Sequence, residues 1–173
     1  MTNYKSQLKE VNTFIFDYDG VLTDGTVILQ EDGEAIRTAN VKDGYALQLA
    51  VKLGFTVAII SGGYSPSMRK RFEALQIKDF FLGVANKLEV LKKYLHDNNI
   101  KPAQVLYMGD DIPDYHAMKE VGIACCPADA VPEIKSISHY ISIKNGGKGC
   151  VRDVIEQTLK VQDKWMTDDG FKW

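Results

Sequence analysis

The sequence has few cysteines, and their spacing excludes two common classes of small protein. Its 173 residues contain three cysteines, of which Cys125 and Cys126 are adjacent and Cys150 is distant. This pattern fits neither a disulfide framework nor the paired spacing of a structural zinc site. We therefore expect three buried, reduced thiols in a cytoplasmic protein.

Long apolar runs and an excess of one charge are also missing. The N-terminal MTNYKSQLKE lacks the apolar core of a signal peptide, and no stretch approaches the roughly 20 apolar residues of a membrane span. Twenty-one basic residues against 23 acidic ones give a net charge of -2. That balance offers no electrostatic footprint for nucleic acid or an anionic membrane, so we expect neither as a partner.

No linker rich in Pro, Gly or Ser interrupts the chain, and no segment repeats. At this length, with 45% hydrophobic residues, the chain can bury one core and is too short for two ordinary ones. We predict a single domain over residues 1–173, with its core at about 11–160. The C-terminal tail, about 164–173, is expected either to be disordered or to pack on a neighbouring subunit.

Short apolar runs alternate with segments of helical period. The predicted strands are 11–16, 55–60, 79–82, 104–108, 122–126 and 139–143. One helix has a clear start, because Ser65 can cap its first turn and Pro66 suits its first position. Strands that are apolar throughout and separated by helices predict an α/β fold, a three-layer, Rossmann-like parallel sheet with helices on both faces.

One segment breaks this alternation. Residues 26–38, TVILQ-EDG-EAIRT, predict a projecting β-hairpin with its turn at Asp32 and Gly33.

Polar clusters follow the strands, where open parallel sheets bind their ligands. The clusters are Asp17 and Asp19 after the first strand, Ser61, Gly62 and Gly63 after the second, and Asp110, Asp111 and Asp114 after the fourth. Lys87 begins the third helix. We therefore expect all of these side chains at one edge of the sheet.

The chemistry of these residues points to a cation and an anion held together. Carboxylates from Asp17, Asp19 and Asp110 suit Mg²⁺ held by few protein oxygens. Ser61 with free backbone N–H groups suits an anion, and Lys87 adds a positive charge. Together they describe phosphoryl transfer, for which a carboxylate nucleophile is chemically reasonable.

Four motifs resemble the ordered signatures of the haloacid dehalogenase superfamily. They are FDYDGVLTDG (16–25), SGG (61–63), Lys87 and GDDIPD (109–114). The longer DGVLTDG form, VKDGYALQLA (41–50), NGGKGCVRDV (145–154) and the short chain resemble more specifically the phosphatases of 3-deoxy-D-manno-octulosonate 8-phosphate, which serve lipopolysaccharide precursor synthesis.

The resemblance implies a role for each acidic residue. Asp17 would attack phosphorus, and Asp19 would protonate the leaving sugar oxygen and then activate water against the aspartyl phosphate. Mg²⁺ would be bound by Asp17, the backbone carbonyl of Asp19 and Asp110. Asp111 or Asp114 would support the metal from behind.

It also implies how the substrate is held. Ser61, the Gly62 N–H and Lys87 would bind the phosphate. The family position of Gly63 is often Arg, or Glu in relatives that act on nine-carbon acids, so phosphatases of 2-keto-3-deoxynononate or N-acylneuraminate 9-phosphate are the alternative. Arg71 is either a solvated helix residue or a ligand of the substrate carboxylate across a subunit boundary.

Superfamily members often carry a cap domain, and the gaps between these motifs are too short for one. An open site needs cover to exclude water. The resemblance implies a homotetramer in which the 26–38 hairpin helps to close a neighbour's site.

Two other functional classes use similar residues. One is a non-catalytic assembly module, related to domains fused to cytidylyltransferases, against which the intact Asp17, Asp19, Lys87 and Asp110 argue. The other is a phospho-accepting receiver domain. Its nucleophilic carboxylate would follow a middle strand of the sheet, and its Lys would follow a late strand.

Overall fold

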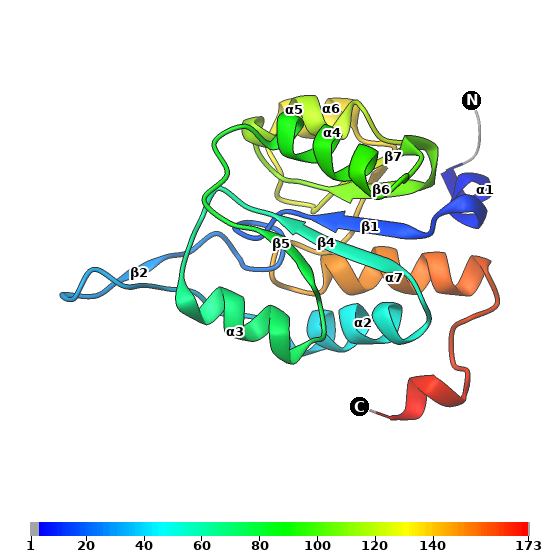
Figure 1. Ribbon diagram of the computed structural model, residues 1–173, viewed down its shortest axis with the longest axis horizontal. Helices are drawn as coiled ribbons and strands as arrows, with labels where there is room; N and C mark the ends of the chain where they lie inside the picture. Colours follow the sequence, from blue (N-terminus) through cyan, green and yellow to red (C-terminus); the bar gives the residue numbers. More distant parts are fainter. Residues whose placement is uncertain (1–3, 173) are drawn as a thin grey trace.

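The computed structural model describes residues 4–172, and its centre is one parallel sheet of six strands (Figure 1). The strand order is β5-β4-β1-β6-β7-β8. The strands are β1 Thr13–Phe16, β4 Thr56–Ile60, β5 Asp79–Phe81, β6 Val105–Met108, β7 Ile123–Cys126 and β8 Tyr140–Ile141. All six predicted strands are confirmed, each slightly shorter than its apolar run.

The register of the central strands brings their carboxyl ends to one edge. Phe16, the last residue of β1, lies opposite Ile59 of β4 and Met108 of β6. Residues that follow these three strands therefore leave the sheet side by side. This alignment places the polar clusters of the sequence together.

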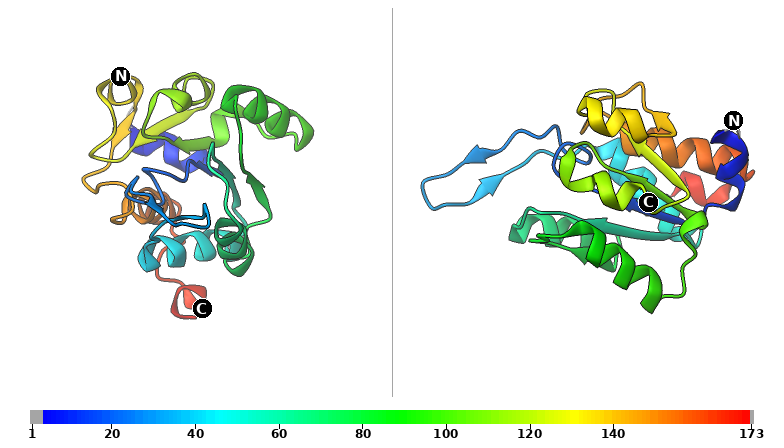
Figure 2. Two further views of the ribbon diagram at one scale, coloured as in Figure 1. Left: turned by 90° about the vertical axis from the view of Figure 1, so that its left-hand side faces the viewer. Right: turned by 90° about the horizontal axis from the view of Figure 1, so that it is seen from above.

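Helices cover both faces of the sheet (Figures 1 and 2). One face carries α2 Val41–Lys52, α3 Pro66–Ala74 and α7 Cys150–Val161, and the other carries α4 Lys87–Asp97, α5 Tyr115–Met118 and α6 Pro132–Ile137. Alternate strand residues serve the two cores, so Phe14 and Phe16 face α2 and α7, whereas Ile15 packs with α4. The three-layer α/β prediction is confirmed.

Polar side chains cap the starts of α2 and α3. Asn40 accepts a hydrogen bond from the Lys42 N–H at the start of α2. Ser65, as predicted, accepts one from the Met68 N–H at the start of α3. The short α5 and α6 were not predicted, because four and six residues carry too little helical period. The remaining short turns are α1 Tyr4–Gln7 and the 3₁₀ segments Leu8–Glu10, Pro102–Gln104, Ile112–Asp114 and Asp168–Phe171.

The predicted hairpin is present and projects beyond the sheet (Figures 1 and 2). Its strands, β2 Ile28–Leu29 and β3 Ala35–Ile36, pair antiparallel around a turn that contains Gly33 with a φ of 85°. Leu29, at the end of β2, is 81% exposed. Within residues 4–172 the chain inserts no cap domain on this scaffold, and the hairpin stands beside the first motif instead.

The described part of the C-terminal tail contacts its own chain, and its packing on a neighbouring subunit stays a prediction. The Tyr45 hydroxyl donates a hydrogen bond to the Gly170 carbonyl, and Lys52 Nζ donates one to the Lys172 carbonyl at 2.9 Å. The Arg152 guanidinium lies over the Trp165 ring. Residues 164–172 therefore pack against α2 and α7 of their own chain, and Trp173 lies outside the described residues.

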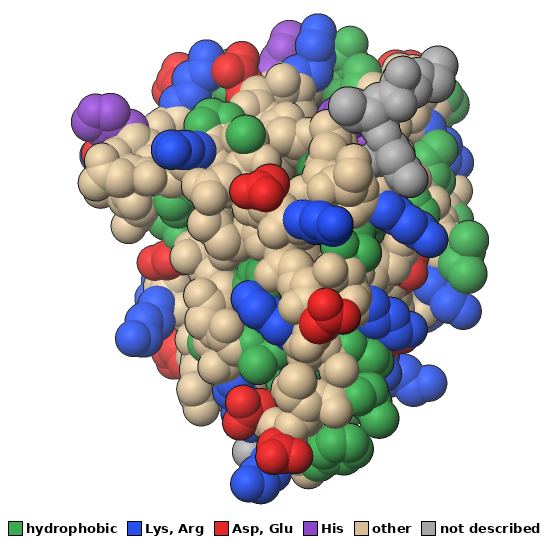
Figure 3. All heavy atoms as spheres, turned by 90° about the vertical axis from the view of Figure 1, so that its right-hand side faces the viewer, with side chains coloured by type: hydrophobic (Ala, Val, Ile, Leu, Met, Phe, Trp, Pro, Cys, Tyr) green, Lys and Arg blue, Asp and Glu red, His purple; other side chains and the backbone are tan. Residues whose placement is uncertain are grey.

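The surface and the thiols agree with the composition. The face opposite the hairpin shows basic and acidic side chains interspersed (Figure 3). None of the helices in residues 4–172 has the length and apolar character needed to span a bilayer. The three cysteines are buried and unpaired, as predicted.

Candidate active site

A cavity of about 420 Å³ opens at the carboxyl edge of the sheet. Every predicted site residue except Arg71 lines it, namely Asp17, Asp19, Ser61, Gly62, Gly63, Lys87, Asp110, Asp111 and Asp114. They come from four separate segments of the chain. The parallel register is the physical reason that they meet.

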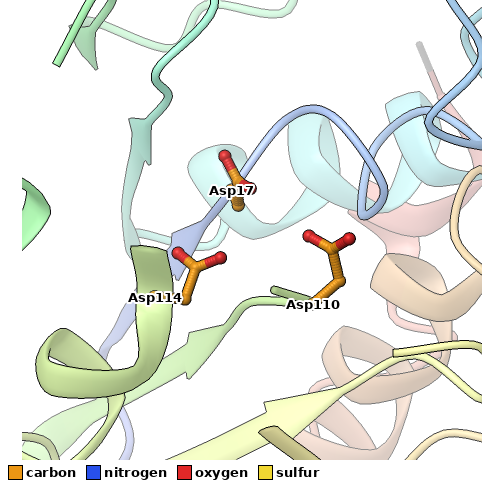
Figure 4. A group of neighbouring side chains, drawn as sticks. All are labelled: Asp17, Asp110 and Asp114. Carbon is orange, nitrogen blue, oxygen red and sulfur yellow. The ribbon is translucent and has the colours of Figure 1, made fainter. Parts of the chain in front are cut away.

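Three carboxylates point into one space in this cavity (Figure 4). Asp17 follows β1, Asp110 follows β6, and Asp114 ends the 3₁₀ turn before α5. One oxygen from each lies within 4.8 Å of the others. Asp114 was predicted only as a residue behind the metal, and the structure brings its carboxylate into the same group.

Lys87 joins two of these carboxylates. Its Nζ lies 2.9 Å from Asp17 Oδ2 and 2.8 Å from Asp114 Oδ1. The Tyr107 hydroxyl donates a second hydrogen bond, of 2.8 Å, to Asp114 Oδ1. The helix start at Lys87 therefore delivers a buried positive charge into the cavity rather than to solvent.

The electrostatics show that this site holds more negative charge than its own groups neutralise. Burial, followed by repulsion from Asp114, raises the pKa of Asp17 well above its usual range, and Lys87 opposes the rise. Burial and Asp114 likewise raise the pKa of Asp110 to about 7. Burial disfavours the charge of Lys87, but Asp114 and Asp17 together raise its pKa above the ordinary value. An added cation would stabilise both carboxylates in their ionised form.

Two buried oxygens and a close backbone approach fit such a cation. Asp110 Oδ1 and Asp114 Oδ2 are buried without a hydrogen-bond donor. Gly20 has a φ of 87°, and a Cβ at this position would overlap the Asp110 carboxylate. An all-oxygen donor set of this kind suits Mg²⁺. The carboxylate of Asp19 is outside the group, and its backbone carbonyl stays a predicted ligand.

Another part of the cavity lining suits an anion. Ser61 is fully buried, and its Oγ accepts a hydrogen bond of 3.1 Å from the Gly63 N–H. The Ser61 N–H is bound to the Phe81 carbonyl, whereas no carbonyl within residues 4–172 accepts from the Gly62 N–H. Lys87 lines the same space. A hydroxyl, a free amide and an ammonium group are donors for phosphate oxygens.

Asp19 has a partner that the sequence did not reveal. Arg37, at the base of the hairpin, places Nε 2.5 Å from Asp19 Oδ1 and Nη2 3.0 Å from Asp19 Oδ2. The hairpin was expected to help close a neighbour's site, and no sequence signal linked Arg37 to the first motif. The two carboxylates of that motif therefore have different environments.

The glycine-rich segment after β8 supports the first motif from behind. The Gly147 N–H donates to the Val21 carbonyl at 2.9 Å. Side chains at Gly146 or Gly147 would overlap the backbone of Gly20 or Thr23. NGGKG thus gives the first motif a close backbone neighbour.

Arg71 lies apart from the cavity. Its guanidinium covers Gly44, between α3 and α2, where a Cβ on Gly44 would overlap it. It borders a small gap lined by Tyr18 and Asn40. Its contact with a substrate in another subunit stays a prediction.

Comparison with known proteins identifies the family. The family model for haloacid dehalogenase-like hydrolases matches residues 79–155. Over 154 residues the chain is 34% identical to the 3-deoxy-D-manno-octulosonate 8-phosphate phosphatase of Yersinia pestis, and the match covers 89% of this chain and 82% of that protein. The chain belongs to this phosphatase family. The resemblance inferred from the motifs is confirmed.

Solved structures of the octulosonate phosphatase family have the same fold. The enzyme from Moraxella catarrhalis, in complex with magnesium ion, phosphate ion and KDO, matches with a TM-score of 0.91 at 32% identity and covers 95% of both chains. The cobalt-bound enzyme from Haemophilus influenzae matches with a TM-score of 0.90 at 33% identity, covering 95% of this chain and 98% of that one.

Proposed function

We propose that this protein is a Mg²⁺-dependent phosphatase that hydrolyses 3-deoxy-D-manno-octulosonate 8-phosphate to 3-deoxy-D-manno-octulosonate and phosphate, in lipopolysaccharide precursor synthesis. The observation that carries the proposal is the meeting of Asp17, Asp110, Asp114, Ser61 and Lys87 in one cavity. Similarity to this family over most of the chain supports the substrate.

The metal would be held by Asp17, Asp110 and the backbone carbonyl of Asp19, with Asp114 beside them. When bound, Mg²⁺ supplies positive charge that offsets the repulsion between the attacking carboxylate and the phosphate. Asp111 is exposed and accepts a hydrogen bond from the Ile112 N–H, so its supporting role is to fix the turn that presents Asp114.

In the first half-reaction, an oxygen of Asp17 attacks phosphorus. The bond between phosphorus and the sugar oxygen breaks, and Asp19 gives its proton to that oxygen. The products are the free sugar acid and an aspartyl phosphate on Asp17. Ser61, the Gly62 N–H and Lys87 hold the phosphate oxygens through this step.

In the second half-reaction, Asp19 takes a proton from water, and the resulting hydroxide attacks phosphorus. The bond to Asp17 breaks, which releases inorganic phosphate and restores the free carboxylate. One carboxylate thus acts as acid and then as base, which requires it to face both the leaving oxygen and the water.

A substrate panel tests the identity of the sugar. We expect the highest kcat/KM on the eight-carbon substrate and weaker turnover of 2-keto-3-deoxynononate and N-acylneuraminate 9-phosphates. Gly63 offers no polar side chain to the sugar, so the nine-carbon acids are the competing substrates. A nine-carbon acid with the higher kcat/KM would move the assignment to that substrate. A folded protein with no turnover on any of the three would favour a non-catalytic assembly module.

We propose further that the protein is a cytoplasmic homotetramer whose hairpin covers a neighbouring subunit's cavity. Apolar side chains are exposed on the hairpin, with Leu29 at 81% and Ile28 at 55%. Such residues at the end of a projecting ribbon suit burial against another subunit. The cavity needs cover of this kind, because an aspartyl phosphate site gains from the exclusion of water.

The oligomer is tested by light scattering. The wild-type chain is expected to run as a tetramer, whereas Leu29→Asp should produce smaller species with reduced activity, because it would bury an unpaired charge. Ile143→Asp is the matched control, since Ile143 is 80% exposed and lies outside the hairpin. A fully active wild-type monomer would contradict the proposal.

A further inference from the structure

The Arg37–Asp19 pair is asymmetric at the two carboxylate oxygens. Arg37 Nε lies 2.5 Å from Oδ1, and Nη2 lies 3.0 Å from Oδ2. A two-pronged contact of this kind fixes both the position and the rotation of a carboxylate. In the described chain no other group donates a hydrogen bond to this carboxylate, so Arg37 sets its orientation.

Arg37 is itself held in place. Its Nη1 donates a hydrogen bond of 2.9 Å to the Ala35 carbonyl in the second hairpin strand. The side chain is 9% exposed, whereas that of Asp19 is 31% exposed. The guanidinium therefore forms a fixed wall behind Asp19, and the open side of Asp19 faces the cavity.

Gly63 provides the space for this pair. A Cβ at this position would lie 2.7 Å from Asp19 Oδ2 and 3.1 Å from Arg37 Nη2. Gly63 is not among the glycines with a positive φ, so its backbone would accept alanine. A side chain at residue 63 would therefore act by shifting the Asp19 carboxylate and the Arg37 guanidinium. Gly63 lines the cavity, and Oδ2 is the Asp19 oxygen that lies next to Gly63.

We propose that Arg37 is a positioning residue for Asp19. Its fork contacts both oxygens and holds the carboxylate so that Oδ2, the oxygen beside Gly63 with the longer contact, gives the proton to the leaving oxygen and takes one from water. The Nε contact to Oδ1 persists when Oδ2 carries the proton. This inference rests on the proposed function, since it concerns proton delivery to a sugar oxygen.

Leaving groups differ in how much they need that proton. A sugar alkoxide is a poor leaving group and depends on a well-placed acid, whereas p-nitrophenolate departs without one. A misplaced Asp19 should therefore lower kcat/KM for the sugar-acid phosphate much more than for p-nitrophenyl phosphate. Loss of Arg37 through general damage to the site would lower both equally.

The test measures kcat/KM on both substrates for the variants Arg37→Ala, Arg37→Lys and Gly63→Ala. For Arg37→Ala we expect a fall of about 10- to 100-fold on the sugar-acid phosphate and less than about threefold on p-nitrophenyl phosphate. Gly63→Ala should show the same pattern. Arg37→Lys should lie between, because an ammonium group cannot contact both oxygens as a fork.

Two further variants show whether Arg37 acts through Asp19. In an Asp19→Asn background, Arg37→Ala should cause no additional selective loss, as in a coupled pair. Arg69→Ala is the matched control, because Arg69 is an exposed arginine on α3 that lies over the Phe80 ring. It should leave both rates unchanged.

Three results would overturn the inference: equal losses on both substrates, no loss in Arg37→Ala, or a full further loss in the Asp19→Asn background. These three results can be distinguished from a failure of the proposed function. In that case the wild-type protein itself would release no phosphate from sugar-acid phosphates, before any variant is compared.

Discussion

Asp17→Asn is expected to abolish turnover and leave the fold intact. An amide is not a nucleophile toward phosphorus, so kcat should fall by at least about 1,000-fold, or roughly 4 kcal/mol of activation free energy. Asp17 Oδ1 accepts a hydrogen bond of 2.6 Å from the Tyr18 N–H, and an Asn oxygen can accept the same bond. The loop should therefore keep its position.

The measurement is steady-state phosphate release, with thermal unfolding as the check on folding. Asp97→Asn is the matched control, since the Asp97 side chain is 47% exposed on α4, away from the cavity lining. A rate within about tenfold of wild type, less than roughly 1.4 kcal/mol, would show that Asp17 is not the nucleophile.

Lys87→Met is expected to lose both phosphate binding and support for the two carboxylates. The Lys87 side chain is 5% exposed, and its Nζ is shared between Asp17 and Asp114. Removing one partner of a buried ion pair costs on the order of 3–5 kcal/mol, because the remaining charges have no compensation. We expect kcat/KM to fall by at least about 100-fold, with a clearly lower melting temperature.

A surface lysine on the same helix provides the comparison. The Lys93 side chain is 78% exposed and pairs with Asp97 four residues later. Such surface pairs contribute at most about 1 kcal/mol, so Lys93→Met should leave activity and stability close to wild type. If Lys87→Met behaved like Lys93→Met, Lys87 would have no role in the site.

The sequence predicted the sheet and most of the cavity because both follow from local pattern and parallel order. The apolar run before Asp17 and the run before Asp110 are adjacent strands in the same direction, so their trailing carboxylates had to meet. Ser65 and Pro66 likewise determine the start of α3 within their own few residues. These predictions needed no knowledge of distant contacts.

The missed features depend on the path of the chain in space. Arg37 reaches Asp19 because the hairpin returns past the first motif, and two-residue strands carry no pattern that indicates this return. The tail contact between Tyr45 and Gly170 joins segments 125 residues apart. Arg71 was singled out for its charge, but its place over Gly44 follows from how α3 packs on α2.

The most direct test of the central claim is phosphate release from 3-deoxy-D-manno-octulosonate 8-phosphate by the wild-type protein, measured with Mg²⁺, after removal of metal by EDTA, and after Mg²⁺ is restored. We expect turnover with Mg²⁺, loss of nearly all of it on chelation, and full recovery on restoration. Folded protein that releases no phosphate with Mg²⁺, or that releases it undiminished in EDTA, would contradict the account.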